Sequence, residues 1–172
     1  TREYRDIPGD YPDRNSILSF ISNYDVCEIF QLSGRNLFPE RRVSVKEAID
    51  LYELVTDRAR KGIGLNIKEK AKKLGLENIV NAGTPVKDIN RQEAAGLIMK
   101  IYALKSGLDY DRLKLGGRIL IKDENDIDDK FYKAVVILAE NKIMRLDARG
   151  CFEPLKHITR GDIMAALWKG LN

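Results

Sequence analysis

The sequence predicts an all-α domain in which three helix–loop–helix repeats surround a central bundle of capped helices with pseudo-threefold symmetry. Three observations predict this fold. A capped helix start occurs three times, a proline stands five residues before each cap, and the same apolar spacing follows each cap. One capped start is common in unrelated helices. Three starts with matching offsets indicate an internal repeat.

Each predicted start has a polar cap residue and an acidic residue three positions later. The cap side chain accepts a hydrogen bond from a backbone N–H one turn into the helix. The acidic side chain can accept one from the backbone N–H of the cap residue, and its charge is favourable at the positive end of the helix dipole. We therefore interpret these six side chains as structural caps. The pairs are Ser44 with Glu47, Asn90 with Glu93, and Thr159 with Asp162.

The residues around each cap carry two further signals. The preceding proline is expected to hold the chain extended before the helix. Apolar residues then recur at i, i+3, i+4 and i+7, the spacing of one buried helical face. The prolines are Pro39, Pro85 and Pro154, and the apolar faces are Ala48, Leu51, Tyr52 and Val55, then Ala94, Leu97, Ile98 and Ile101, then Ile163, Ala166, Leu167 and Gly170.

The elements follow in order. Residues 13–24 predict a helix, because Ile17, Phe20, Ile21 and Tyr24 share one face. The capped helices are expected over 44–60, 90–105 and from 159 onward, with glycines 62 and 64 ending the first. Residues 66–75 and 128–141 predict two more helices, whereas 106–125 is irregular with a short extended piece at 118–121. The units span about 1–60, 61–107 and 118–172, with 108–117 as a linker.

Composition excludes several classes of protein. With 172 residues, 44% hydrophobic and 33% charged, the chain can bury a core, and no run is apolar enough for membrane insertion. The chain begins at Thr1 without a basic and apolar leader, so we expect a mature segment or an excised piece. Cys27 and Cys151 could pair if the first and third units are neighbours, or remain two buried free thiols.

The sequence offers little support for a catalytic site or a metal site. The only histidine is His157, and no nucleophile–base pair, phosphate loop or metal-ligand set is present. Asp123, Asp126, Asp128 and Asp129 lack the spacing and glycine of a calcium loop. We therefore expect no enzyme, no cofactor and no metal. The formal charge of +4 permits an anionic partner and demands none.

The motifs resemble those of the S-layer homology domain, in its usual form of three tandem units. Tyr4-Arg-Asp6 and Ile121-Lys-Asp123 are similar to the unit openings. Residues 141–144 and 147–154 are similar to the loop of a third unit, and Ile158-Thr-Arg-Gly-Asp162 to the start of its second helix. The resemblance covers essentially the whole chain.

This resemblance implies a non-catalytic anchor in the cell wall or S-layer of a bacterium with a Gram-positive-type envelope. It implies that grooves between units bind an anionic secondary cell-wall polysaccharide that carries pyruvate ketals, and that the chain belongs to a larger surface protein. Arg160 is the first helical residue, so its side chain is expected to point outward beside unsatisfied N–H groups and receive a carboxylate. The candidate carbohydrate-binding residues are Arg160, Arg91, Thr159, Asp6, Tyr11, Asp123, Asp147 and Lys46.

The first and second units depart from the family's pattern. Val45 stands where the first unit should have its arginine, and Lys46 could supply the charge from one position along. The second unit lacks the Asp-Gly-x-Phe loop, and Asn90 replaces the family's threonine. An alternative function is therefore a structural or protein-interaction domain that keeps the fold without the sugar site. A third is a basic nucleic-acid binder, favoured by the lysine-rich residues 68–73, although their spacing is typical of a solvated helix face.

Overall fold

A computed structural model describes residues 4–56 and 64–172, and this part of the chain is all-α, with six α-helices, two short 3-10 helices and no strands. The predicted all-α class is therefore confirmed. Two predicted elements differ in detail: the first capped helix ends at Val55, and the extended piece at 118–121 forms no strand. Residues 57–60, predicted to continue that helix, lie outside the described residues. The elements are α1 (Arg14–Asn23), α2 (Val45–Val55), α3 (Ile67–Leu74), α4 (Arg91–Ser106), η2 (Tyr110–Arg112), η3 (Glu124–Asp126), α5 (Asp129–Glu140) and α6 (Arg160–Leu171).

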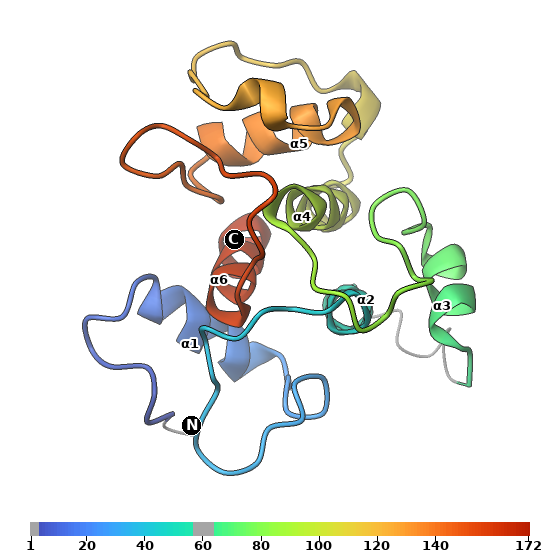
Figure 1. Ribbon diagram of the computed structural model, residues 1–172, viewed down its shortest axis with the longest axis vertical. Helices are drawn as coiled ribbons and strands as arrows, with labels where there is room; N and C mark the ends of the chain where they lie inside the picture. The colour runs from blue at the N-terminus through green and yellow to red at the C-terminus, as the bar shows by residue number, and fades with distance from the viewer. Residues whose placement is uncertain (1–3, 57–63) are drawn as a thin grey trace.

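The three capped helices α2, α4 and α6 lie at the centre, and α1, α3 and α5 lie outside them (Figure 1). All twelve predicted apolar positions of the capped helices are buried, which explains the central packing. We call α1 with residues 25–39 lobe 1, α3 with 75–85 lobe 2, and α5 with 141–154 lobe 3. Each outer helix packs on the central helix of the preceding unit: α1 on α6, α3 on α2 and α5 on α4.

The segments that precede the central helices hydrogen-bond to one another in a closed cycle. The Val43 N–H donates to Ile158 O at 3.2 Å, the Ile158 N–H to Ile89 O at 3.3 Å, and the Ile89 N–H to Val43 O at 2.9 Å. These three side chains are fully buried. The cycle satisfies backbone groups that could not otherwise be buried without cost, and so it fixes the three helix starts relative to each other.

The prolines have a different role from the one expected. Instead of an extended segment, each occupies the second position of a β-turn, where its fixed φ is favourable. The turns are closed by the N–H groups of Arg41, Lys87 and Lys156, which donate to residues 38, 84 and 153 at 3.0–3.1 Å. Each turn then covers the start of a central helix from another unit. The proline therefore shapes the cover of a neighbouring helix.

The caps themselves form as predicted at α2 and α4, where both hydrogen bonds of the capping box are present. At α6 the Thr159 hydroxyl accepts from the Asp162 N–H at 3.2 Å, but the box is incomplete. The prediction that the Asp162 side chain accepts a hydrogen bond from the backbone of the cap residue is therefore wrong. Aspartate is one methylene shorter than the glutamates at the other two starts, and its exposed carboxylate does not reach back.

Candidate functional site

The first two backbone amides at each central helix start are already bonded. At α6 the N–H groups of Arg160 and Gly161 donate to Arg41 O at 2.8 Å and Pro39 O at 2.9 Å, and the equivalent bonds cover α2 and α4. The third amide is bound by the cap. The prediction of unsatisfied N–H groups open to an anion is therefore wrong, because backbone carbonyls of a neighbouring turn take that place.

Arg160 does not point outward as predicted. Only 5% of the residue is exposed, and its guanidinium stacks over the Phe30 ring with 4.5 Å to the centroid. It donates to Phe30 O and Leu37 O, both at 3.4 Å, and to the Glu47 carboxylate at 3.1 Å. Sequence could not show this, because the partners lie more than 100 residues away. The side chain clamps lobe 1 onto the start of α6.

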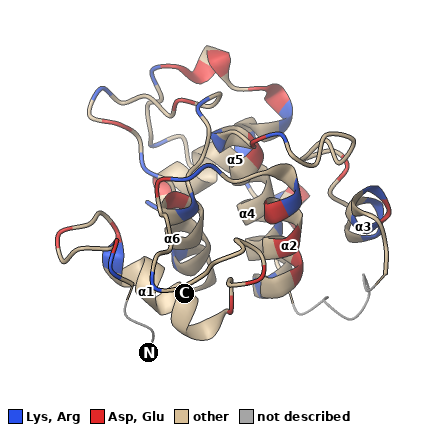
Figure 2. Ribbon diagram, turned by 60° about the horizontal axis from the view of Figure 1, so that its bottom comes forward, with Lys and Arg blue, Asp and Glu red and all other residues tan. Residues whose placement is uncertain are grey.

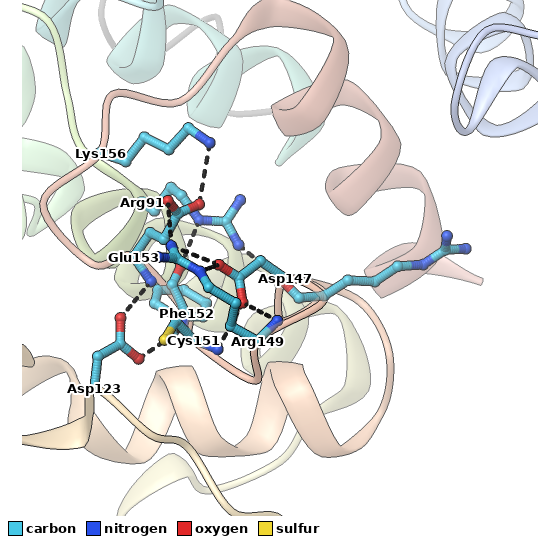
Figure 3. A network of polar contacts seen from close by, with 9 residues as sticks. Arg91, Asp123, Asp147, Arg149, Cys151, Phe152, Glu153 and Lys156 are labelled. Carbon is cyan, nitrogen blue, oxygen red and sulfur yellow. Dashed lines mark hydrogen bonds and ion pairs between the residues drawn. The ribbon is translucent and has the colours of Figure 1, made fainter.

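Arg91 makes the equivalent contact with lobe 3, as Figure 3 shows. Its Nε donates to Phe152 O at 2.8 Å and its Nη2 to Arg145 O at 2.9 Å, while the guanidinium lies over the Phe152 ring. Burial lowers the pKa of Arg91, and the nearby carboxylate of Asp162 opposes that shift. Each arginine thus holds the loop of the following unit, with Arg160 closing the ring onto the first.

Asp6 and Asp123 hold the same two loops from the other side. The two carboxylate oxygens of Asp123 accept from the N–H groups of Phe152 and Glu153, both at 2.7 Å, and Asp6 binds Leu37 and Phe38 in the same way. The second residue of each bonded pair has a left-handed backbone, with φ of 57° at Glu153 and 54° at Phe38. These bonds stabilise a conformation that costs a non-glycine residue about 1–2 kcal/mol.

The other predicted binding residues also have partners within the chain. Asp147 accepts from the backbone N–H of Cys151, which is the main reason its pKa is lowered, and from Arg149. The Tyr11 hydroxyl donates to Glu40, and burial followed by that carboxylate raises the pKa of Tyr11. Lys46 is exposed and pairs with Asp50 at 2.6 Å.

The structure thus sorts the predicted residues into separate groups. Arg91, Asp123 and Asp147 meet in the loop of lobe 3 (Figure 3), and Asp6, Tyr11, Thr159 and Arg160 surround the contact between lobe 1 and α6. Lys46 lies apart on α2. Cys27 and Cys151 are both half-buried and form no disulfide, so the disulfide alternative is not realised.

A polar groove of about 550 Å³ lies at the start of α4, between lobe 2 and the start of α5. We call it the α4 groove. Lys68 and Lys130 lie on its two sides, and amide side chains line it between them. Its polar lining consists of Lys68, Glu77, Asn78, Asn81, Asn90, Gln92, Glu93, Asp128 and Lys130, so three carboxylates accompany the two lysines.

Gln92 fixes the position of α5 relative to this groove, because its side-chain oxygen accepts from the Asp128 N–H at 2.9 Å. Phe131 packs closely over Gly96, where an added Cβ would lie 2.9 Å from the ring. Gln92, Gly96 and Phe131 belong to none of the motifs in the sequence. They come together only because α5 packs on the helix of the preceding unit.

Amide groups both donate and accept hydrogen bonds, so the α4 groove can bind hydroxyl groups, and its lysines can attract an anion. Among the described residues, no cluster of three His, Cys, Asp or Glu side chains is arranged to hold a metal ion. No helix in that part of the chain is both long and apolar enough to cross a membrane. No protein-family model matches the chain, and no curated protein matches it significantly.

Proposed function

We propose that this protein is a non-catalytic anchoring module that binds an anionic secondary cell-wall polysaccharide at a bacterial cell surface. The proposal includes a fold of three repeats with pseudo-threefold symmetry. Two findings support that arrangement: the closed cycle of hydrogen bonds among the helix starts, and the repeated clamps of Arg91 and Arg160. The motif resemblance supports the cell-wall ligand.

The observation that carries the binding role is the α4 groove. It is open to solvent, and it presents amide side chains between Lys68 and Lys130. A sugar chain offers hydroxyl groups at short intervals, which suit amide donors and acceptors, and a ketal carboxylate suits the flanking ammonium groups. In this proposal Arg91 and Arg160 hold the lobes, and the ligand binds the groove that the lobes form.

Co-sedimentation with purified cell-wall sacculi tests the proposal. Native walls should bind the protein, and walls stripped of secondary polysaccharide should not. The double variant K68E/K130E should weaken binding by at least about tenfold, equivalent to roughly 1.4 kcal/mol. The double variant K114E/R118E is the matched control, because it makes the same change of charge at two exposed residues outside the groove. Equal binding by the double variant would refute the groove as the site.

A second candidate is a structural or protein-interaction domain that lacks the sugar site. The internal bonding of Arg91 and Arg160 favours it, because neither guanidinium is presented to solvent as a free receptor. A folded protein that fails to sediment with native walls would support this candidate and contradict the first.

A further inference from the structure

The segment that precedes η3 is bonded to the rest of the molecule along only one edge of its backbone. Residues 118–122 belong to no helix or strand and run past α5 at the edge of the molecule (Figure 1). We call them the open segment. The Arg118 N–H donates to the Glu140 carboxylate at 3.1 Å, and the Lys122 N–H to Gly150 O at 3.0 Å. These two N–H groups share one edge, because alternate residues of an extended chain direct their N–H groups to the same side.

The opposite edge is formed by Ile119 and Ile121. Within the described chain neither of their N–H groups donates a hydrogen bond, and Ile119 O accepts none. Ile121 O accepts only a long bond of 3.4 Å from the Glu124 N–H. A row of unpaired backbone groups of this kind is a template for pairing with another extended chain.

The side chains of the open segment alternate as in a β-strand. Ile119 packs against the core, and Ile121 is 3% exposed. Arg118, Leu120 and Lys122 are exposed, Leu120 by 75%. This period of two leaves one face buried and one face free. The buried face matters, because a ribbon of two strands is stable only when it packs on a larger structure.

The free face is basic and has an apolar centre. Arg118 and Lys122 flank Leu120, and neither basic side chain forms an ion pair with the described residues. Figure 2 shows basic residues, in blue, among the loops outside α5. In an antiparallel pair of two copies with Leu120 opposite Leu120, each Arg118 would lie opposite a Lys122. Like charges placed opposite each other destabilise a strand pair, so the free face favours an acidic strand over a second copy.

We propose that the open segment binds an extended acidic segment of another protein by strand addition. The partner pairs its backbone with Ile119 and Ile121, places an apolar side chain against Leu120, and places carboxylates beside Arg118 and Lys122. In complexes of this kind the main-chain hydrogen bonds provide affinity and the side chains provide specificity.

This inference stands independently of the proposed polysaccharide binding. The α4 groove is lined by Asp128, Lys130 and Phe131 at the start of α5, whereas the open segment is bonded to Glu140, the last residue of that helix. From residue 130 to 140 a helix rises by about 15 Å, so the two surfaces are separate.

A synthetic peptide tests the proposal with the whole chain. The acetylated and amidated peptide Thr-Glu-Val-Leu-Val-Glu-Thr places its two glutamates and its leucine on one face of a strand. Its dissociation constant, measured by fluorescence anisotropy at low ionic strength, should lie below about 1 mM. Replacing both glutamates by lysine should raise that constant at least about tenfold, because the peptide then meets like charges. A constant above about 1 mM for the acidic peptide, or equal affinity for the two peptides, would overturn the proposal.

Charge-reversed variants locate the contact. R118E/K122E should prefer the lysine peptide over the glutamate peptide by at least about tenfold. K68E/K130E is the matched control, because it makes the same change of charge in the α4 groove, and it should bind the glutamate peptide like the parent. If R118E/K122E does not fold, as judged by circular dichroism, R118Q/K122Q replaces it and should lose the preference between the peptides. An unchanged preference for the glutamate peptide in either variant would overturn the proposal.

Amide hydrogen exchange followed by NMR tests the backbone pairing separately. The acidic peptide, near saturation, should slow exchange at the amides of Ile119 and Ile121 about fivefold or more, since both become hydrogen-bonded. The Arg118 amide, already bonded to Glu140, should change little. Binding that leaves exchange at residues 119 and 121 unchanged would overturn strand addition and assign the free face to anions of any kind.

Discussion

Replacing Arg160 by methionine separates a structural clamp from a ligand receptor. Methionine fills much of the same volume but removes the charge and all donors. The change leaves the Glu47 carboxylate, which is 18% exposed, without the guanidinium now 3.1 Å away. Removing one partner of a buried ion pair costs about 3–5 kcal/mol. The two carbonyl bonds are long at 3.4 Å and add little.

We therefore expect Arg160→Met to lower the free energy of unfolding by about 3–4 kcal/mol, near the low end of that range because Glu47 keeps its bond to the Ser44 N–H. For a domain of this size the melting temperature should fall by about 6–16 °C. Urea and thermal unfolding followed by circular dichroism measure both quantities.

Arg91→Met is the matched comparison. Its partners are the neutral carbonyls of Phe152 and Arg145, so the expected cost is about 1–2 kcal/mol.

In a double-mutant cycle, Glu47→Gln with Arg160→Met should cost about 1–3 kcal/mol less than the sum of the single changes. An Arg160→Met protein that is as stable as the parent but no longer binds cell walls would refute the structural role of Arg160. It would support the original prediction that Arg160 binds the ligand.

Three further predictions address the lobes. Asp123→Asn should remove an acceptor from the loop of lobe 3 and cost about 1–3 kcal/mol, with faster hydrogen exchange at the Phe152 amide. Gly96→Ala should cost about 1–3 kcal/mol in urea unfolding, because the added Cβ would press on the Phe131 ring; unchanged stability would mean that the ring moves freely. The Asp147 pKa, followed by NMR, should lie below 3.8, and its contribution to stability should be present above the unfolded pKa and lost as pH falls through the folded value.

The parts of the fold that depend on neighbours in sequence could be predicted. Ser44, Asn90 and Thr159 cap their helices because a cap needs only the next turn of chain. The spacing of the apolar residues likewise predicts which side of each helix is buried, since a helix repeats every 3.6 residues. Asp162 shows the limit of the pattern, because the box depends on side-chain length as well as on charge.

The site could not be predicted in the same way. The direction of the Arg160 side chain depends on carbonyl groups of residues 30 and 37, which are distant in sequence. The α4 groove depends on the packing of α5 against the helix of the preceding unit, and the packing partner of a helix is not encoded in its own periodicity. A pattern of local spacing gives the elements, and the contacts between units decide which side chains remain accessible.

The pairing of each arginine with the following unit also explains the two irregularities of the repeat. The loop that residue 45 would clamp is the loop of lobe 2, which has no phenylalanine, whereas Arg91 and Arg160 lie over Phe152 and Phe30 of lobes 3 and 1. Val45 is 2% exposed, so a valine there avoids burying a charge without a partner. Lobe 2 is instead attached to α2 by Lys70, which pairs with Glu53 at 2.6 Å and Asp50 at 3.0 Å. The absence of an arginine at position 45 and of a phenylalanine in the loop of lobe 2 therefore concerns a single contact, and an ion pair between α2 and α3 attaches lobe 2 instead.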